Sequence, residues 1–267
     1  MTRAPKVSVI VPAFNEPVEV IEESLTSLMN QTFDDFECIV VDDSTQPDLA
    51  LACKSICARD GRFRYVHPSR RLGLPGSLNL AISMARGELI ARFDSDDICV
   101  KNRLEMQVVF LGQNPDVDIV GSWMQIINAF NNPISVRKYA ISHQAIEWRF
   151  IYSNGIGHPT VMFRHEIIRD IKGPYREGFK FSEDLELWLN LLGKGIKFAN
   201  IPECLICYRQ NTTYRPRSNW KFNIRARLRH LSEPNFLFKI IVILLLVIWT
   251  YLPESFRKFI YKKVVLN

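Results

Sequence analysis

The sequence has no internal repeat and no low-complexity segment, which excludes repeat arrays and long disordered tracts. Apolar residues make up 47% and charged residues 23% of the chain, as in a folded globular protein. A chain of 267 residues can bury a sizeable core as one domain, or as one domain with an appended segment.

A secretory signal is also lacking. The N-terminal stretch MTRAPKVSVIVPAFN has only a short apolar run and no small-residue cleavage site. A reducing cytosol is therefore the expected compartment. A zinc site is disfavoured because Cys204 and Cys207 lie in a predicted strand and point to opposite faces. We expect the six cysteines to be buried thiols: Cys38, Cys53, Cys57, Cys99, Cys204 and Cys207.

An excess of positive over negative charge is missing from most of the chain and is confined to its end. Residues 214–267 hold eleven lysines and arginines against two acids, whereas residues 1–213 hold 23 bases and 26 acids. The formal net charge of +6 is therefore a property of the C-terminal segment. A basic segment of this kind indicates an anionic partner, either lipid or nucleic acid.

The C-terminal segment also contains an apolar run, FLFKIIVILLLVIWTYL, residues 236–252. As a helix, its seventeen residues would reach about 25 Å, just short of a bilayer core of ~30 Å. Positive charge on both flanks leaves open whether the helix spans the membrane or lies in the interface, and a buried core helix is the alternative. We expect residues 214–267 to associate with anionic lipid through these flanking side chains: Arg215, Arg217, Lys221, Arg225, Arg227, Arg229, Arg257, Lys258, Lys262 and Lys263. Nucleic acid is disfavoured because the basic residues flank an apolar run and do not interleave with aromatics.

Strand and helix patterns alternate over about the first 125 residues. β-branched runs that end in polar residues predict strands, and apolar residues at helical spacing lie between them. This alternation predicts an α/β fold with a mostly parallel, Rossmann-like sheet flanked by helices. The predicted strands are residues 6–15, 36–44, 62–68, 88–93, 118–127, 158–164 and 201–210, and the clearest helices are residues 75–87 and 182–195.

Polar clusters follow three of the predicted strands: Asn15–Glu16, Asp42–Asp43 and Asp94–Asp97. The carboxyl ends of parallel strands meet at one edge of an open α/β sheet, which is where ligands bind. For Asp42 and Asp43, the residues leave two possibilities open. They form either a strand-to-loop turn or an acceptor for a base edge or ribose hydroxyl.

The stretch GELIARFDSDDICV places three aspartates within four positions. Like charges at this spacing repel, and each favours protonation of the others. Asp94 and Asp96 share one face of an extended chain, so they can bind one hard cation, and Asp97 can add a ligand. The alternative is an acidic turn that caps the next helix, but capping requires one acid and leaves Asp94 unexplained. We therefore predict a site for Mg²⁺ or Mn²⁺ at these three residues.

Asp184 is the candidate general base. Ser182 is a plausible N-cap of the predicted helix, and the helix dipole accounts for Glu183 in its first turn. Asp184, however, lies one turn before Trp188 on the apolar face and is predicted to point inward, where an unpaired charge is costly.

Four segments together resemble glycosyltransferase family 2: VSVIVPAFNE, QTFDDFECIVVDDS, GELIARFDSDD and FSEDLELWLNLL. The resemblance covers about residues 5–210, and the order of the four motifs is its specific feature. It implies a GT-A fold and a nucleotide-diphosphate sugar as donor. It also assigns Asp184 as the catalytic base and places His158 on the acceptor side. The residues implied to bind the nucleotide are Pro12, Ala13, Phe14, Glu16, Asp42, Asp43, Arg71 and Asp94, and those implied to bind the metal are Asp94, Asp96 and Asp97.

One position departs from the family pattern, because Gln210 and Asn211 stand where a histidine often closes over the diphosphate. The resemblance implies a catalytic domain, residues 1–213, followed by a membrane-associating segment, residues 214–267. It implies inverting, metal-dependent transfer from a UDP-sugar to a glycan or lipid-linked acceptor of surface polysaccharide synthesis, at the cytoplasmic face of the membrane. The alternatives are a nucleotidyltransferase, whose Gly-rich phosphate loop is missing from VPAFNEP, and a catalytically silent membrane adaptor.

Overall fold

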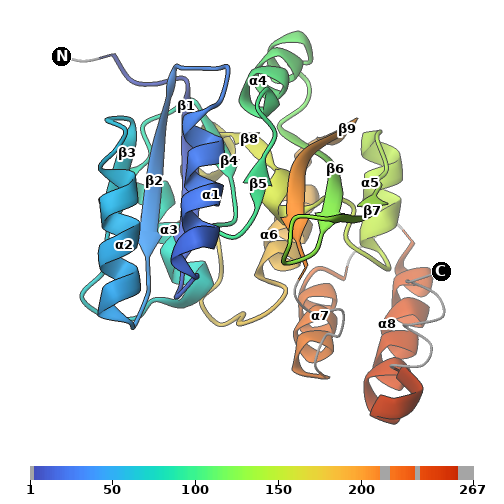
Figure 1. Ribbon diagram of the computed structural model, residues 1–267. Coiled ribbons are helices and arrows are strands. Elements are labelled where there is room, and N and C mark those ends of the chain that lie inside the picture. The colour runs from blue at the N-terminus through green and yellow to red at the C-terminus, as the bar shows by residue number, and fades with distance from the viewer. Residues whose placement is uncertain (1–2, 211–216, 232–234, 258–267) are drawn as a thin grey trace.

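The computed structural model describes residues 3–210, 217–231 and 235–257. Within these residues, a nine-stranded sheet has the order β3-β2-β1-β4-β8-β6-β9-β5, with β7 paired to β6 (Figure 1). The strands are β1 Val7–Ala13, β2 Phe36–Asp42, β3 Phe63–Val66, β4 Leu89–Arg92, β5 Ile98–Cys99, β6 Ile119–Ile127, β7 Pro133–Arg137, β8 Met162–Arg164 and β9 Phe198–Arg209. The helices are α1 Val18–Met29, α2 Pro47–Cys57, α3 Gly73–Met84, α4 Arg103–Gln113, α5 His143–Phe150, α6 Glu183–Gly193, α7 Arg217–Arg229 and α8 Phe236–Tyr251, and two short 3₁₀ helices are η1 His158–Thr160 and η2 His165–Ile168.

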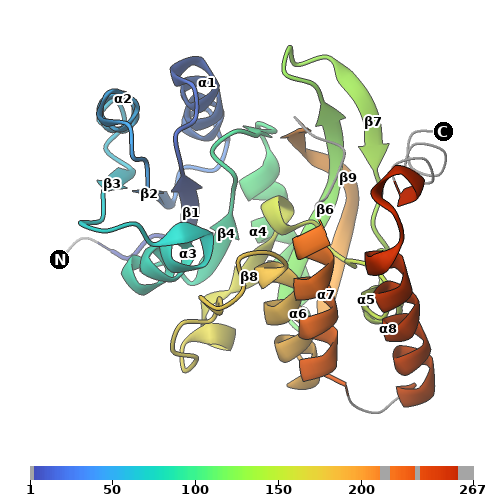
Figure 2. The same cartoon turned by 90° about the horizontal axis from the view of Figure 1, so that it is seen from below.

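The first half of the sheet is parallel, as predicted. β1 pairs with β2 and β4, and β2 pairs with β3, all in parallel register. Because side chains alternate along a strand, Val9 and Val11 pack with α1 whereas Ile10 packs with α3 on the other face. Figure 2 shows α1 and α2 on one side of these strands and α3 on the other. The α/β fold with flanking helices is therefore confirmed.

The second half of the sheet is mixed. β8 runs antiparallel to β4 and β6, and β5 runs antiparallel to β9, whereas β6 and β9 are parallel. The predicted strand over residues 158–164 is shorter than expected, because its first part forms η1 and only Met162–Arg164 is extended. The six cysteines are free thiols, four of them buried and Cys204 and Cys207 partly exposed.

The C-terminal helices pack against the sheet domain (Figure 2). Ala226 of α7 is completely buried and belongs to the same core cluster as Trp188 of α6. α8 contacts α7 through the rings of Trp220 and Trp249, whose centroids lie 6.1 Å apart. Within the described residues, no helix combines the length and apolar character needed to cross a membrane.

The predicted apolar helix is present as α8 but is not a buried core helix. It buries Val242, Ile243 and Thr250 and exposes much of its remaining apolar surface. The exposed large side chains of α8 are Phe236, Leu237, Phe238, Ile241, Leu244, Leu245, Ile248 and Tyr251. Four of the predicted flanking basic residues lie outside the described residues, together with Asn211 of the departure noted above: Arg215, Lys258, Lys262 and Lys263.

Gly87, just before β4, tests how closely β1 and the chain entering β4 approach. A Cβ at this position would lie 2.5 Å from the backbone nitrogen of Ser8 and 2.8 Å from the carbonyl carbon of Val7. We expect Gly87→Ala to cost about 1–3 kcal/mol in the free energy of unfolding, because backbone atoms must move apart. The melting temperature should fall by roughly 2–4 °C for each kcal/mol.

Gly61→Ala is the matched control, since a Cβ there meets nothing within 4 Å. Equal melting temperatures for the two variants, measured by calorimetry, would contradict the close approach at Gly87.

Candidate active site

The structure brings the three predicted polar clusters together at one edge of the sheet. The backbone N–H of Asp43 donates to the carbonyl of Ala13 (2.9 Å), and that of Asn15 donates to Ser44 Oγ (2.8 Å). Ser95 Oγ donates to Glu16 Oε1 (2.7 Å). We call this edge the acidic rim, defined by Glu16, Asp42, Asp43, Asp94, Asp96 and Asp97.

The loop after β1 is fixed by its own side chains. Asn15 adopts a left-handed backbone (φ 56°), and its Oδ1 accepts from the backbone N–H groups of Thr45 and Gln46 at the start of α2. Glu16 accepts from the N–H of Phe14 (2.6 Å) as well as from Ser95, and burial raises its pKa. Glu16 thus holds the loop after β1 to the aspartate turn, and its contact with a nucleotide stays a prediction.

Phe14 and Arg71 form one exposed surface beside this loop. Phe14 is 40% exposed, and the guanidinium of Arg71 lies 4.1 Å from the centre of its ring. Pro12 and Ala13 precede Phe14 at the end of β1. Arg71 Nε lies 3.8 Å from Asp43 Oδ2, so its charge is close to the rim.

Asp43 connects the end of β2 to the start of α3. Its Oδ1 accepts from the N–H of Leu72 (2.8 Å) and its Oδ2 from the N–H of Gly73 (2.7 Å). Gly73 has φ +69°, a backbone conformation that glycine adopts without strain. Both carboxylate oxygens therefore have donors, which keeps Asp43 oriented at the rim.

Asp42 points away from the edge. Its carboxylate is completely buried, with Oδ1 accepting from the N–H of Ser44 (3.0 Å) and Oδ2 from Tyr65 Oη (2.8 Å). Both oxygens are therefore bonded to β3 and the turn, and contact between Asp42 and a nucleotide stays a prediction. Asp42 supports the backbone from which Asp43 projects.

Arg92 is the cation that the sequence analysis missed. It lies on β4, is 2% exposed, and both of its terminal nitrogens bond the Asp94 carboxylate. Positions 92 and 94 share one face of an extended chain, so the alternation that paired Asp94 with Asp96 also predicts this contact. Burial would lower the pKa of Arg92, but Asp94 together with Tyr175 and Asp97 acts in the opposite direction, and the net effect raises that pKa. The first positive charge beside the aspartates is therefore part of the protein.

Asp96 and Asp97 retain the crowded charge. Burial, with Asp94 and Glu16 nearby, raises the pKa of Asp96 to about 7. Asp97 is completely buried, and burial together with Asp94 and Asp96 raises its pKa well above the usual value. Its Oδ1 accepts from the N–H of Arg209 (2.8 Å), whereas its Oδ2 has no hydrogen-bond partner in the described part of the chain.

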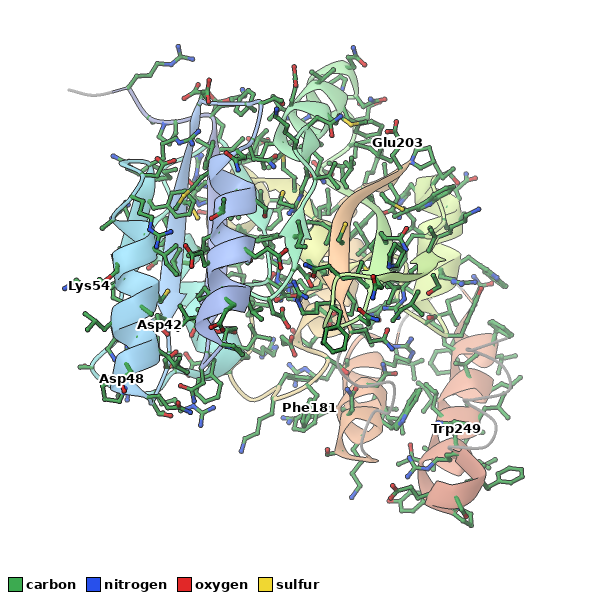
Figure 3. All side chains as sticks on the ribbon, in the orientation of Figure 1. Asp42, Asp48, Lys54, Phe181, Glu203 and Trp249 are labelled. Carbon is green, nitrogen blue, oxygen red and sulfur yellow. The ribbon has the colours of Figure 1, made fainter. Side chains whose placement is uncertain are left out.

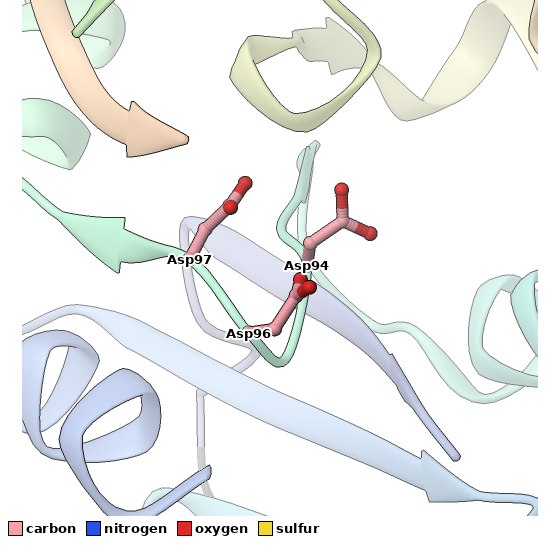
Figure 4. A group of neighbouring side chains, drawn as sticks. All are labelled: Asp94, Asp96 and Asp97. Carbon is pink, nitrogen blue, oxygen red and sulfur yellow. The ribbon is translucent and has the colours of Figure 1, made fainter. Parts of the chain in front are cut away.

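The three aspartates fit a hard cation. One carboxylate oxygen of each, Asp94, Asp96 and Asp97, lies within 4.8 Å of the others, and Figure 4 shows all three on the turn between β4 and β5. An all-oxygen set of this kind suits Mg²⁺ or Mn²⁺. The unpartnered Oδ2 of Asp97 is the atom that such an ion would satisfy.

Arg209, at the end of β9, positions the aspartate turn and was also missed. Its Nε donates to the carbonyl of Asp96 (2.8 Å), and its other nitrogens donate to Asn131 Oδ1 (2.6 Å) and Glu23 Oε2 (2.7 Å). Four segments therefore meet at one 5%-exposed side chain. No pattern in the sequence distinguishes this arginine from one on a solvated strand end.

Asp184 lies in the first turn of α6, as predicted, and is partly exposed. Its Oδ2 accepts from Asn154 Nδ2 (3.1 Å). Ser182 stands at the N-cap, but it has a left-handed backbone (φ 57°) and its side chain makes no capping hydrogen bond. The capping role expected for Ser182 is therefore not observed. Glu183, which the dipole seemed to explain, is 7% exposed, and burial and then Asp184 raise its pKa to about 7.

His158 packs against α6, the helix that carries Asp184. Its Nε2 is 2.9 Å from Tyr175 Oη, and its ring centre is 6.0 Å from that of Trp188. Burial, and secondarily the charge of Arg92, lower the pKa of His158 well below its usual value. His158 is therefore a neutral interior group here, and contact with an acceptor stays a prediction.

We predict that the Arg92–Asp94 pair is an interaction whose loss is costly. Arg92→Met should lower the free energy of unfolding by about 3–5 kcal/mol, because it leaves Asp94 charged and largely buried. The double variant Arg92→Met/Asp94→Asn should recover part of this loss, since no orphan charge remains. Urea unfolding measures both.

Arg59→Met is the control, because Arg59 pairs with Glu22 on the surface and its loss should cost less than about 1 kcal/mol. If the double variant were as unstable as Arg92→Met, the loss would reflect packing of the arginine stem and not the orphaned charge.

The buried Glu183 predicts a pH-dependent stability. Its pKa in the folded protein, about 7, lies above the unfolded value of 4.5, so its favourable contribution is present at low pH and is lost as pH rises through 7. Glu183→Gln should therefore gain melting temperature relative to the wild type between pH 4.5 and 8, measured without divalent cations. A difference that stays constant across this range would show that Glu183 does not titrate there.

Known proteins share this architecture and sequence. The chain matches the family described as Glycosyl transferase family 2 over residues 8–171. It is 33% identical to the O-antigen biosynthesis glycosyltransferase WbnJ of Escherichia coli, over 75% of this chain and 78% of that protein. It is 28% identical, over 98% of this chain and 97% of that protein, to the UDP-Gal:alpha-D-GlcNAc-diphosphoundecaprenol beta-1,3-galactosyltransferase of Escherichia coli.

Among solved structures, the mannosyltransferase PcManGT of Pyrobaculum calidifontis, in complex with GDP-Man and Mn²⁺, has the same fold. It superimposes with a TM-score of 0.65 at 17% identity and covers 96% of this chain and 72% of that chain. The family match over residues 8–171 and the identity with the relatives show that the chain belongs to glycosyltransferase family 2.

Proposed function

We propose that this glycosyltransferase moves a sugar from a UDP-sugar to a hydroxyl of a lipid-linked or glycan acceptor, with inversion at the anomeric carbon. The observation that carries this proposal is that two features lie close together, since burial and then the charges of Asp184 and Asp94 raise the pKa of Glu183. A cluster of carboxylates suited to a cation lies at the rim, and a partly exposed carboxylate, Asp184, lies at the start of α6.

The donor is proposed to lie across the acidic rim. Pro12, Ala13 and Phe14 would line the base pocket, Asp43 would accept from the base, and Arg71 would approach the diphosphate. Asp94, Asp96 and Asp97 would hold a divalent cation, which offsets the charge of a leaving diphosphate when bound. The Mn²⁺ in PcManGT and the UDP-sugar named for the Escherichia coli galactosyltransferase support these assignments.

Asp184 is proposed to take the proton from the acceptor hydroxyl as that oxygen attacks the sugar. Asn154 donates a hydrogen bond to Asp184 Oδ2, which favours the ionised carboxylate. One displacement from the face opposite the diphosphate inverts the anomeric centre. General-base assistance of this kind is typically worth about 10²–10⁴-fold in rate.

The C-terminal helices support a membrane location, and the name of a relative supports a lipid-linked acceptor. Two features support membrane association: the exposed apolar face of α8 and the exposed cations Lys221 and Arg225 on α7. The galactosyltransferase relative is named for a diphosphoundecaprenol-linked acceptor. We therefore propose that residues 214–267 contact the cytoplasmic face of the membrane during synthesis of a surface polysaccharide such as O-antigen, capsule or exopolysaccharide.

We predict that Asp184→Asn separates chemistry from binding. The amide cannot accept the proton, so transfer should fall by about 10²–10⁴-fold, whereas the affinity for the nucleotide sugar stays unchanged. The transfer rate is measured with a panel of nucleotide sugars, Mg²⁺ or Mn²⁺, and a diphospholipid-linked acceptor. The affinity for the nucleotide sugar is measured by titration calorimetry.

Asp116→Asn, which changes an exposed acid outside the rim, is the matched control. Wild-type transfer rates in Asp184→Asn would remove Asp184 from the role of base. If no nucleotide sugar bound with either cation, a silent membrane adaptor would become the better description.

A further inference from the structure

One loop supplies a hydrogen-bond partner of Asp184, and α7 helps to hold that loop in place. Asn154 lies in the segment between α5 and η1, and its Nδ2 reaches Asp184 Oδ2. Tyr152 and Ser153, which precede it, are exposed. The position of Asn154 therefore depends on the bonds made by the backbone of this short loop.

Arg227 of α7 makes two of those bonds. Its Nε donates to the carbonyl of Ile151 (3.0 Å), and its Nη2 donates to the carbonyl of Ser153 (3.2 Å). On the other side of Asn154, Asn200 Nδ2 donates to the carbonyl of Gly155 (3.1 Å). Arg227 and Asn200 thus fix the loop on either side of the residue that bonds the base.

The burial of Arg227 indicates that the contact is more than incidental. Arg227 is 5% exposed, and burial lowers its pKa to about 10, which leaves it charged at neutral pH. Asp184 is the acid whose charge acts in the opposite direction on the pKa of Arg227. A buried cation costs free energy, and here its hydrogen bonds go to carbonyl oxygens beside the active site.

The start of α7 reaches the same end of α6. Ser182 is the residue before α6, and its Oγ lies 3.4 Å from Asn219 Oδ1. The ring centre of Phe181 lies 6.0 Å from that of Phe222 of α7, with the rings tilted by 59°, and Figure 3 shows Phe181 beside this helix. α7 therefore contacts both segments that orient Asp184, the chain entering α6 and the loop of Asn154.

We infer that Arg227 is a positioning residue for the reaction: through Ile151 and Ser153 it holds Asn154 against Asp184 and so keeps the base oriented and ionised. This inference rests on the proposed role of Asp184. It makes α7 a part of the catalytic unit as well as the link to α8. A displaced base costs rate steeply, because a shift of about 1 Å can reduce turnover by 10²-fold.

The test compares Arg227→Met and Asn154→Ala with Arg59→Met in the full chain. Arg59 is exposed and pairs with Glu22 on the surface, so it controls for the loss of an arginine side chain away from the site. The measurements are kcat and KM for the donor, the pH profile of kcat, and the melting temperature.

For Arg227→Met and Asn154→Ala we expect kcat to fall at least tenfold while KM for the donor stays within twofold. The acidic limb of the kcat profile should move to higher pH, because the loss of a positive charge or of a donated hydrogen bond favours the protonated base. Arg227→Lys keeps the charge and should recover part of kcat. The double variant should be no slower than the slower single one, since both changes act through one contact.

Wild-type kcat and pH profile in Asn154→Ala would overturn the inference even if Arg227→Met failed to fold, because Asn154 is partly exposed and its loss leaves the core intact. A fall in kcat for Arg59→Met equal to that for Arg227→Met would also overturn it. If the wild type itself transferred no sugar, the proposed function would fail and this inference with it. An active wild type with unaffected variants would remove only the inference.

Discussion

The site depends on how crowded negative charge is compensated inside the protein. Two unit charges about 4 Å apart repel by about 4 kcal/mol at the effective dielectric constant of a protein surface. The buried Arg92 neutralises Asp94, but Asp96 and Asp97 remain with raised pKa values and with one oxygen of Asp97 unpartnered among the described residues. The protein thus supplies one compensating charge itself and leaves an all-oxygen site that suits a divalent cation.

The rim stays in place because several elements bond it at once. Asn15 connects the loop after β1 to α2, Asp43 connects β2 to α3, and Arg209 connects the aspartate turn to α1 and to the turn after β6. These bonds include charge-assisted ones, which are shorter and stronger than neutral hydrogen bonds. Donors and acceptors fixed in this way need little rearrangement when a charged ligand arrives, which is the general requirement for electrostatic catalysis.

The sequence predicts the edge of the sheet but not every side chain that faces it. Strand patterns place Asp43 and Asp94 at strand ends, and a helix pattern places Asp184 at a helix start, because both follow from local periodicity. The orientation of the Asp42 carboxylate does not follow from local periodicity, since it depends on Tyr65 from the neighbouring strand. The antiparallel β8 and the burial of Glu183 likewise depend on packing between segments distant in the chain. Arg92 is different, because its alternation with Asp94 was visible in the sequence.

The two faces of α7 have different surroundings, although both carry basic residues. Bases exceed acids after residue 213, and two of these bases, Lys221 and Arg225, lie on the exposed face of α7. The inner face of α7, with Ala226 and Arg227, is buried in the core shared with α6. One helix therefore presents cations outward and holds the loop beside Asp184 inward. α8 contacts α7 through Trp220 and Trp249, and α7 bonds the loop of Asn154 through Arg227, so the exposed apolar helix and the loop beside Asp184 are joined by two contacts.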